Sequence, residues 1–212
     1  MPNCRILIES KDIEKILKSD YFDNIPKRYL KKNEICFPNS ERILIIKKGK
    51  IKVTYYNNEK EITLYYLCKN NMAYCNQNNI IKAKENSEFY FLKADEYYEL
   101  FKDPNFCNLL LNSLTKNINI ERELIFDLAF KTCSQRAIEF LTSAAIAAGE
   151  KTPKGLKINL NCTIDEFATF LGTSRQTLSM FLNMLIKNNI MEKKGQKTFF
   201  IKDIKALRNF KF

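Results

Sequence analysis

The sequence predicts an α+β protein with an N-terminal antiparallel β-barrel or jelly roll, a long helix, and a C-terminal winged helix-turn-helix. Short strand-like runs follow one another from about residue 30 to residue 93. A helical stretch with no glycine then covers residues 104–130, and a capped helix, a glycine turn, a second helix and a basic hairpin occupy 163–201. We therefore expect three parts: a β-roll domain over 1–103, a long helix over 104–130 and a winged helix-turn-helix domain over 131–212.

Composition narrows the class of function. The net charge is +11, and residues 131–212 hold 14 basic against 6 acidic side chains. This basic third indicates a polyanion partner, although a lysine-rich solvated surface would give the same count. The chain has no histidine, no glycine-rich phosphate loop and no paired acidic cluster, which argues against an enzyme. Seven cysteines without a signal peptide predict free thiols in the cytoplasm, and no apolar run is long enough for a membrane span.

The N-terminal part predicts short elements. Residues 9–20 have the apolar spacing of a short helix. Residues 42–56 contain two strand-like runs around Lys48-Gly49, a turn signal, and 61–67 and 88–92 predict further strands. Several short strands in series favour a small antiparallel barrel or jelly roll.

The helix over 104–130 would be about 39 Å long at about 1.5 Å per residue, too long to lie under a small barrel. We predict that two such helices pair in parallel within a homodimer, and one long packed helix in a monomer is the alternative. The apolar positions expected at the pair follow a heptad-like spacing that Glu121 interrupts: Leu111, Leu114, Ile118, Ile125 and Leu128.

The C-terminal part carries the strongest local signals. A helix over 133–148 ends at Gly149, and Thr163 with Glu166 forms a capping box that begins another helix, which ends at Gly172. Ser174 is the expected N-cap of the next helix, whose polar start would face the bases of DNA, while the lysines of the following hairpin would contact phosphates. An ordinary helical hairpin with a polar start is the alternative. The predicted DNA contacts are Thr173, Ser174, Arg175, Gln176, Ser179, Lys193, Lys194 and Lys197.

Residues 167–195, FATFLGTSRQTLSMFLNMLIKNNIMEKKG, resemble the helix-turn-helix and wing of the Crp/Fnr family of bacterial transcription regulators. The strand region resembles the cyclic-nucleotide-binding-like sensor of that family, and 104–130 resembles its dimerisation helix. The resemblance implies a cytoplasmic homodimer that binds a near-palindromic double-stranded operator, with RNA polymerase as a further partner. Arg175-Gln176 stands where many members have Arg-Glu, so the resemblance transfers no target sequence.

The sensor departs from members that bind cyclic AMP. Residues 70–92 contain no glycine, no arginine and no suitably placed glutamate to hold a phosphate and a ribose, which argues against a cyclic nucleotide. The residues EKEITLYYL, Met72 to Cys75 and the Met1-Pro2 start are most similar to the haem carbon monoxide sensors of the family. That likeness implies Cys75 and Pro2 as haem ligands, but Gln77 occupies the position of the histidine that ligates the reduced iron.

Cysteines without histidine suit iron–sulfur chemistry. Fnr-type members hold a cluster with four cysteines, three of them near the N-terminus, whereas here only Cys4 lies there. Cys68 and Cys75 flank the site where effectors of the family bind, so the candidate ligands are Cys68, Cys75, Cys107 and Cys4. The favoured signal is nitric oxide or oxygen at such a cluster. Haem sensing of a gas and a cofactor-free organic ligand in the β-roll are the alternatives, and any of these thiols can instead serve as a small packed group.

Overall fold

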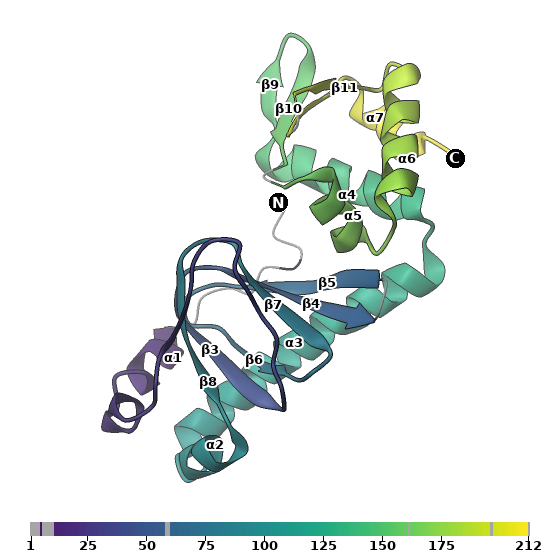
Figure 1. Cartoon of the computed structure of the whole chain (residues 1–212). Coiled ribbons are helices and arrows are strands. Elements are labelled where there is room, and N and C mark those ends of the chain that lie inside the picture. The colour runs from purple at the N-terminus through teal and green to yellow at the C-terminus, as the bar shows by residue number, and fades with distance from the viewer. Residues whose placement is uncertain (1–4, 6–10, 58–59, 161, 196, 212) are drawn as a thin grey trace. The chain divides into compact units, whose positions relative to one another are not determined.

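The computed structural model describes residues 5, 11–57, 60–160, 162–195 and 197–211 (Figure 1). The chain divides into two compact units, Arg5–Leu124 and Ile125–Phe212. The first unit contains two four-stranded antiparallel sheets, and the second contains one four-stranded sheet with helices packed against it. The predicted class, α+β with a jelly-roll-like N-terminal part and a C-terminal helix-turn-helix, is confirmed, although the sheets do not close into a barrel.

In the first unit, one sheet has the strand order β1-β8-β3-β6 and the other has the order β2-β7-β4-β5. Every neighbouring pair is antiparallel. The elements are α1 (Lys11–Ile16), η2 (Asp20–Asp23), β1 (Arg28–Leu30), β2 (Ile35–Cys36), β3 (Arg42–Lys48), β4 (Ile51–Asn57), β5 (Lys60–Leu67), β6 (Met72–Cys75), β7 (Asn79–Ala83), β8 (Ser87–Leu92), α2 (Ala94–Leu100) and most of α3 (Pro104–Phe130).

Strand β3 is apolar on both faces because both faces are covered. Leu44 and Ile46 point into the core between the two sheets, together with Phe89 and Phe91 of β8. The alternate residues of both strands pack on the opposite face against α1, α2 and α3: Ile43, Ile45, Tyr90 and Leu92. A strand buried on two sides needs a continuous apolar run, which explains the sequence RILII.

The turn predicted at Lys48-Gly49 is present, and Gly49 has a φ of 95°, a conformation that favours glycine. The strands that flank it do not pair with each other. β3 pairs with β6 and β8, whereas β4 pairs with β5 and β7, so the turn passes the chain from one sheet to the other. The strands β1, β2, β6 and β7 were not predicted, because they are short and lack a clean apolar alternation.

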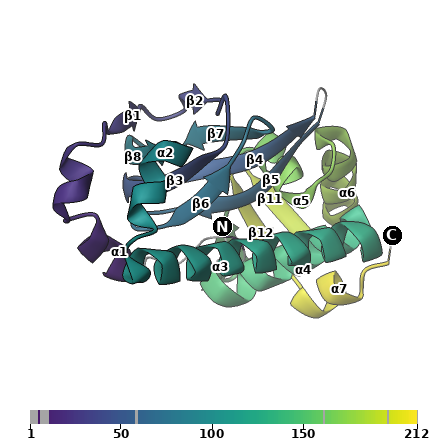
Figure 2. The same cartoon turned by 90° about the horizontal axis from the view of Figure 1, so that it is seen from below.

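Helix α3 covers the predicted range and runs alongside the sheets of the first unit (Figure 2). Its buried residues in that unit are Phe106, Leu110, Asn117 and Leu124, and Asn117 Nδ2 donates to the Met72 carbonyl at 3.1 Å. Leu111, Ile118, Ile125 and Leu128 are exposed and form what we call the α3 stripe. Leu114, also predicted at the dimer contact, is half-buried and packs against the core that includes residues of α1, α2 and α3. No helix in the described part of the chain is long and apolar enough to cross a membrane.

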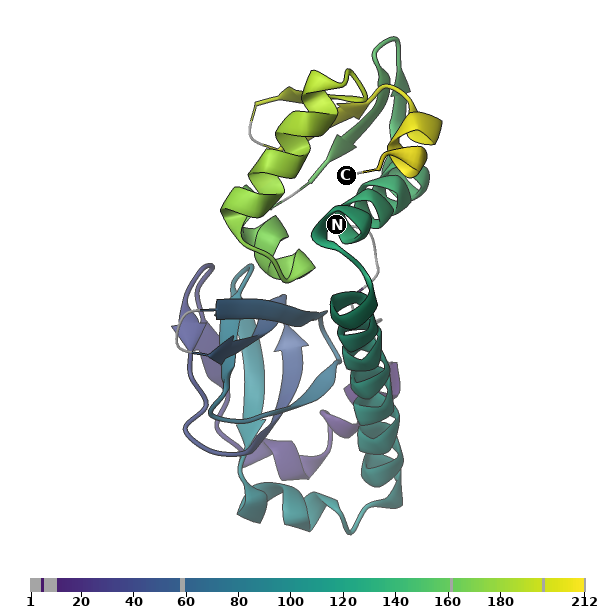
Figure 3. The ribbon, with the colours of Figure 1, turned by 90° about the vertical axis from the view of Figure 1, so that its right-hand side faces the viewer.

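The second unit has a sheet of order β11-β12-β10-β9 (Figure 3). Ring pairs between Phe140, Phe167 and Phe170 join α4 to α5 at centroid distances of 4.6 and 5.2 Å. The elements are α4 (Cys133–Ala148), β9 (Glu150–Thr152), β10 (Gly155–Asn159), α5 (Ile164–Leu171), α6 (Arg175–Lys187), β11 (Met191–Lys194), β12 (Thr198–Ile201) and α7 (Ile204–Asn209).

Candidate nucleic-acid interface and sensor core

The helix-turn-helix consists of α5 and α6, and local hydrogen bonds define both ends of its turn. Thr163 and Glu166 cap α5 reciprocally, and Gly172 ends it with a φ of 65°. Ser174 caps α6, and its Oγ accepts from the Thr177 amide at 3.0 Å. These ends agree with the sequence prediction because each is set by residues at most five positions apart.

Helix α6 has one buried face and one exposed face. Leu178, Phe181, Leu182 and Leu185 are buried and fix the helix on the unit. Among the predicted base contacts, Ser174, Arg175 and Gln176 are exposed, whereas Thr173 and Ser179 are half-buried. The exposed polar N-terminal end is the geometry with which a recognition helix enters the major groove.

Arg175 is held at the surface by a carboxylate. Its Nη1 lies 3.3 Å from Asp165 Oδ2, and the two side chains are 69% and 59% exposed. An ion pair this exposed is worth about 0–1 kcal/mol, so a guanine or phosphate can displace Asp165 at little cost. The pair keeps the guanidinium beside the exposed N-terminal end of α6.

The wing is the β11–β12 hairpin, which turns at Gly195 with a φ of 68°. Lys193, Lys194 and Lys197 are all exposed, and Lys193 Nζ lies 5.9 Å from the centroid of the Phe199 ring. The hairpin is tied to the rest of the unit because β12 also pairs with β10. It therefore presents three cations on a supported edge, as contacts to phosphates require.

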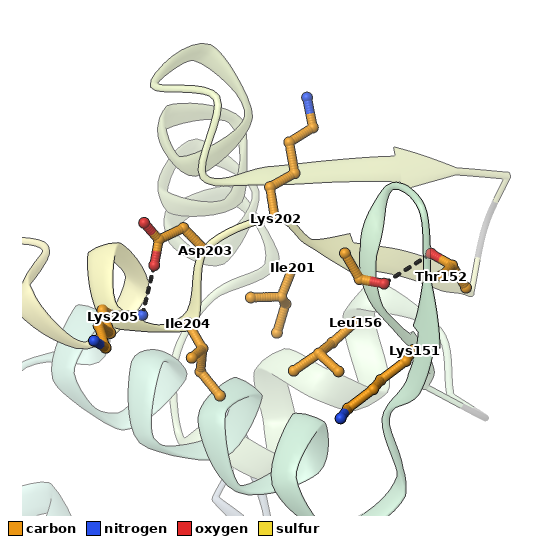
Figure 4. Close-up of a pocket in the computed structure, with 9 residues that line it drawn as sticks. Lys151, Thr152, Leu156, Ile201, Lys202, Asp203, Ile204 and Lys205 are labelled. Carbon is orange, nitrogen blue, oxygen red and sulfur yellow. Dashed lines mark hydrogen bonds between the residues drawn. The ribbon is translucent and has the colours of Figure 1, made fainter.

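A shallow hollow of about 480 Å³ lies elsewhere on this unit, between the β9–β10 hairpin and the start of α7 (Figure 4). Leu156, Ile201 and Ile204 supply its apolar side chains. Of its polar groups, Asp203 caps α7 and Lys202 Nζ bonds Asn189, so both are engaged within the protein. The hollow contains none of the predicted DNA contacts.

The structure does not gather the predicted metal ligands. Cys68 follows β5 in a tight turn, Cys75 ends β6 inside the sheet core, and Cys107 lies in the first turn of α3 with its Sγ 3.3 Å from the Phe101 carbonyl oxygen. Cys4 lies outside the described residues, as does Pro2. Among the residues that the structure describes, no group of three or more histidine, cysteine or acidic side chains is placed to hold a metal ion. As they are placed, the three described candidates Cys68, Cys75 and Cys107 do not by themselves form an iron–sulfur site.

Cys75 is a buried acid beside two others. Burial raises the pKa of its thiol to about 12, and the neighbouring Cys36 and Glu121 add to the shift. Burial also raises the pKa of Tyr65, with Cys75 and Glu121 contributing, and the pKa of Glu121 itself. With no metal ion beside it, Cys75 is therefore held as a neutral thiol in the sensor core.

The raised pKa of the Cys75 thiol should make the stability of the folded protein depend on pH. A folded pKa raised above the ordinary value of 9.0 favours the protonated thiol, so its contribution is complete below pH 9 and is lost as pH rises toward 12. We expect the Tm of the parent protein to fall more steeply between pH 9 and 11 than that of Cys75→Ala. Calorimetry checks this, and parallel slopes would contradict the assignment. At pH 7 the substitution should cost about 1–3 kcal/mol through the cavity it leaves.

Two features escaped the sequence prediction. Met180 and Asn183 are exposed on α6 and extend the exposed face about one and two turns beyond Gln176, as a helical projection would have shown. Arg136 is buried in α4 and bonds four main-chain carbonyls. The sequence pattern that could have indicated this burial is a single cation on a helix face that otherwise carries Ala137, Phe140 and Leu141.

Comparison with known proteins places these features in context. Residues 135–210 match the model of the Crp-like helix-turn-helix domain. The Global nitrogen regulator of Synechococcus elongatus is 24% identical over 172 residues, which cover 74% of this chain and 77% of that protein.

Solved structures resemble almost the whole chain. A double mutant of CooA from Carboxydothermus hydrogenoformans is 25% identical, with a TM-score of 0.73 and coverage of 95% of this chain and 96% of that one. A structure of CprK complexed with OCPA is 18% identical, with a TM-score of 0.68 and coverage of 91% and 92%, and this second likeness concerns the fold alone.

Proposed function

Since the chain belongs to the Crp/Fnr family of transcription regulators, we propose that it is a homodimer that binds a near-palindromic double-stranded operator and responds to a signal through its first unit. The observation that carries the proposal is the exposed start of α6, with Arg175 and Gln176 beside the lysine-bearing wing. Arginine can pair with guanine and glutamine with adenine in the major groove. RNA polymerase is the further partner that we propose for the DNA-bound dimer.

The α3 stripe supports the dimer. Leu111, Ile118 and Ile125 are spaced seven residues apart, and they are 62%, 46% and 64% exposed. A seven-residue apolar repeat on a helix surface is the pattern by which two parallel helices pair. Two subunits joined in this way would place two α6 helices in successive major grooves, about 34 Å apart.

The wing tests DNA binding directly. We expect each change of Lys193, Lys194 or Lys197 to alanine to weaken binding to all sequences alike and to reduce the slope of log affinity against log salt by about one phosphate contact. Fluorescence anisotropy of an operator selected from random DNA, across a salt series, measures both. Lys116→Ala on α3 removes the same charge away from the wing and is the control. A slope unchanged in all three wing variants would refute the phosphate contacts.

For the signal, we propose that the first unit binds a small organic molecule without a resident metal. The separate positions of Cys68, Cys75 and Cys107 favour this chemistry over the iron–sulfur cluster or haem considered from the sequence. A cluster would require these thiols to move together, and haem ligation would require the sulfur of Cys75 to become accessible from within the apolar core.

Metal content separates these chemistries. We expect protein purified without oxygen to be colourless and to contain neither iron nor acid-labile sulfide in amounts comparable to the protein. Iron with sulfide and a broad visible absorbance would show an iron–sulfur cluster, and iron with a sharp Soret band would show haem. Either result would contradict the proposal of a metal-free sensor. In either case Cys75→Ser and Cys68→Ser, compared with Cys162→Ser at a buried cysteine of the second unit, would identify the ligands.

A further inference from the structure

Arg136 is a charged side chain inside the second unit. It lies in the first turn of α4 and is 9% exposed. Its guanidinium donates to four main-chain oxygens, and these belong to two separate segments of the chain. A buried arginine needs such partners, because an uncompensated buried charge is strongly destabilising.

The first segment is the end of the long helix α3. Arg136 Nη1 donates to the carbonyl oxygens of Lys131 at 2.6 Å and Asp127 at 3.3 Å. The second segment is the turn of the helix-turn-helix. Nε donates to the Leu171 carbonyl oxygen at 2.8 Å, and Nη2 donates to that of Gly172 at 3.4 Å.

Both segments are helix C-termini. The last carbonyls of a helix have no partner within it, and they carry the negative end of the helix dipole. One guanidinium therefore neutralises and joins the C-terminal ends of α3 and α5. Its planar fork of five donors can reach both ends at once, which a single ammonium group cannot do.

The second end leads directly to the DNA contacts. Gly172 is followed by Thr173, whose amide bonds the Ala168 carbonyl, and then by Ser174, the cap of α6. The end of α3 is thus connected to the first turn of α6 through the Arg136 side chain and two residues of main chain, Thr173 and Ser174. A movement of the α3 end can therefore be transmitted to α6 along this short path. The α3 end that Arg136 contacts belongs to a continuous helix from Pro104 to Phe130, whose earlier turns lie in the first unit.

We propose that Arg136 is a positioning residue that sets the spacing between the last turn of α3 and the N-terminus of α6, so that a change in α3 alters operator recognition. This inference rests on the proposed function, because it concerns how the same DNA-binding face is regulated. Arg136 contacts no base or phosphate in this role. It acts through the main chain of the turn.

A neighbouring side chain provides a matched control. Lys131 Nζ bonds Asp127 Oδ1 at 2.8 Å and Glu139 Oε2 at 2.6 Å, so it braces the same α3–α4 junction. These bonds do not reach α5 or α6. Lys131→Gln and Arg136→Gln remove one positive charge each from adjacent places, but only the second variant releases the turn.

The experiment uses the full-length protein and its selected operator. Hydrogen–deuterium exchange is followed over residues 127–131, 171–178 and 190–201, and anisotropy gives the affinity for the operator and for a random duplex. For Arg136→Gln we expect faster exchange in both of the first two segments, with the wing unchanged. The operator-to-random affinity ratio should fall about 3- to 30-fold, the range typical of residues that couple two sites. Lys131→Gln should speed exchange near 127–131 only and should leave the ratio within about twofold.

Arg136→Lys keeps the charge and serves if the glutamine variant does not fold. We expect it to retain affinity for random DNA but to show the same loss of operator preference. Full preference and full protection of 171–178 in Arg136→Lys would overturn the proposal, as would exchange that rises evenly over the whole unit in either variant. A parent protein that selects no operator would refute the proposed function instead, and the exchange pattern would still test the link between the two helix ends.

Discussion

Replacing Ile118 with lysine should convert the protein into a monomer and reduce its affinity for a two-half-site operator by at least about a hundredfold. Ile118 is the middle residue of the α3 stripe, so in the dimer a lysine there would place two like charges within an apolar seam. The two recognition helices would then belong to separate molecules. The second half-site would no longer be bound at the high effective concentration that the dimer provides. Analytical ultracentrifugation and anisotropy measure the two effects.

Asn119→Lys is the matched control for this result. It adds the same charge at the adjacent exposed position, which a heptad places away from the seam. We expect it to remain dimeric and to bind the operator as the parent does. A dimeric Ile118→Lys protein would show that the stripe is not the subunit contact, while binding to a single half-site should stay unchanged in both variants.

Replacing Arg175 with alanine should lower operator affinity by about 1–3 kcal/mol and relax the choice of base at one position in each half-site. The side chain is exposed at the first residue of α6, and its pairing with Asp165 in the free protein is weak enough to be exchanged for a base. Anisotropy against the operator and its single-base variants measures the change.

Arg208→Ala controls for the loss of charge, since Arg208 is exposed on α7 and outside the proposed interface. It should weaken operator and random DNA by the same small factor. Arg175→Ala should weaken the operator more than random DNA. Equal losses in both would mean that Arg175 contacts phosphate and does not select a base.

The C-terminal half of the fold was predictable because its signals are local. Thr163, Gly172 and Ser174 each mark a helix end through bonds to residues at most five positions away, and the structure places the ends of α5 and α6 accordingly. The exposed start of α6 followed from the same bonds. Its tie to α3 through Arg136 did not, because the acceptors at Leu171 and Gly172 are main-chain atoms that carry no sequence signature.

The sensor was less predictable because its contacts are distant in sequence. β3 is paired with β8 more than forty residues later, so the turn at Gly49 did not reveal its partner. Leu114 fitted the heptad pattern, yet it is half-buried because it packs against the core of the first unit. The cysteine positions show the same limit: a list of thiols does not say which strand end or helix turn each one occupies.

The two-sided burial of β3 and β8 has a consequence for the order in which the chain can fold during synthesis. Ile43, Ile45, Tyr90 and Leu92 are covered partly by Leu100, Phe106 and Leu110, which leave the ribosome after all of the strands of the first unit. Until α3 has emerged, one face of the sheet is an exposed apolar surface of the kind that promotes aggregation. A recombinant sensor that stops at residue 103 would be fixed in that state, whereas one that continues through Leu124 would include its own cover.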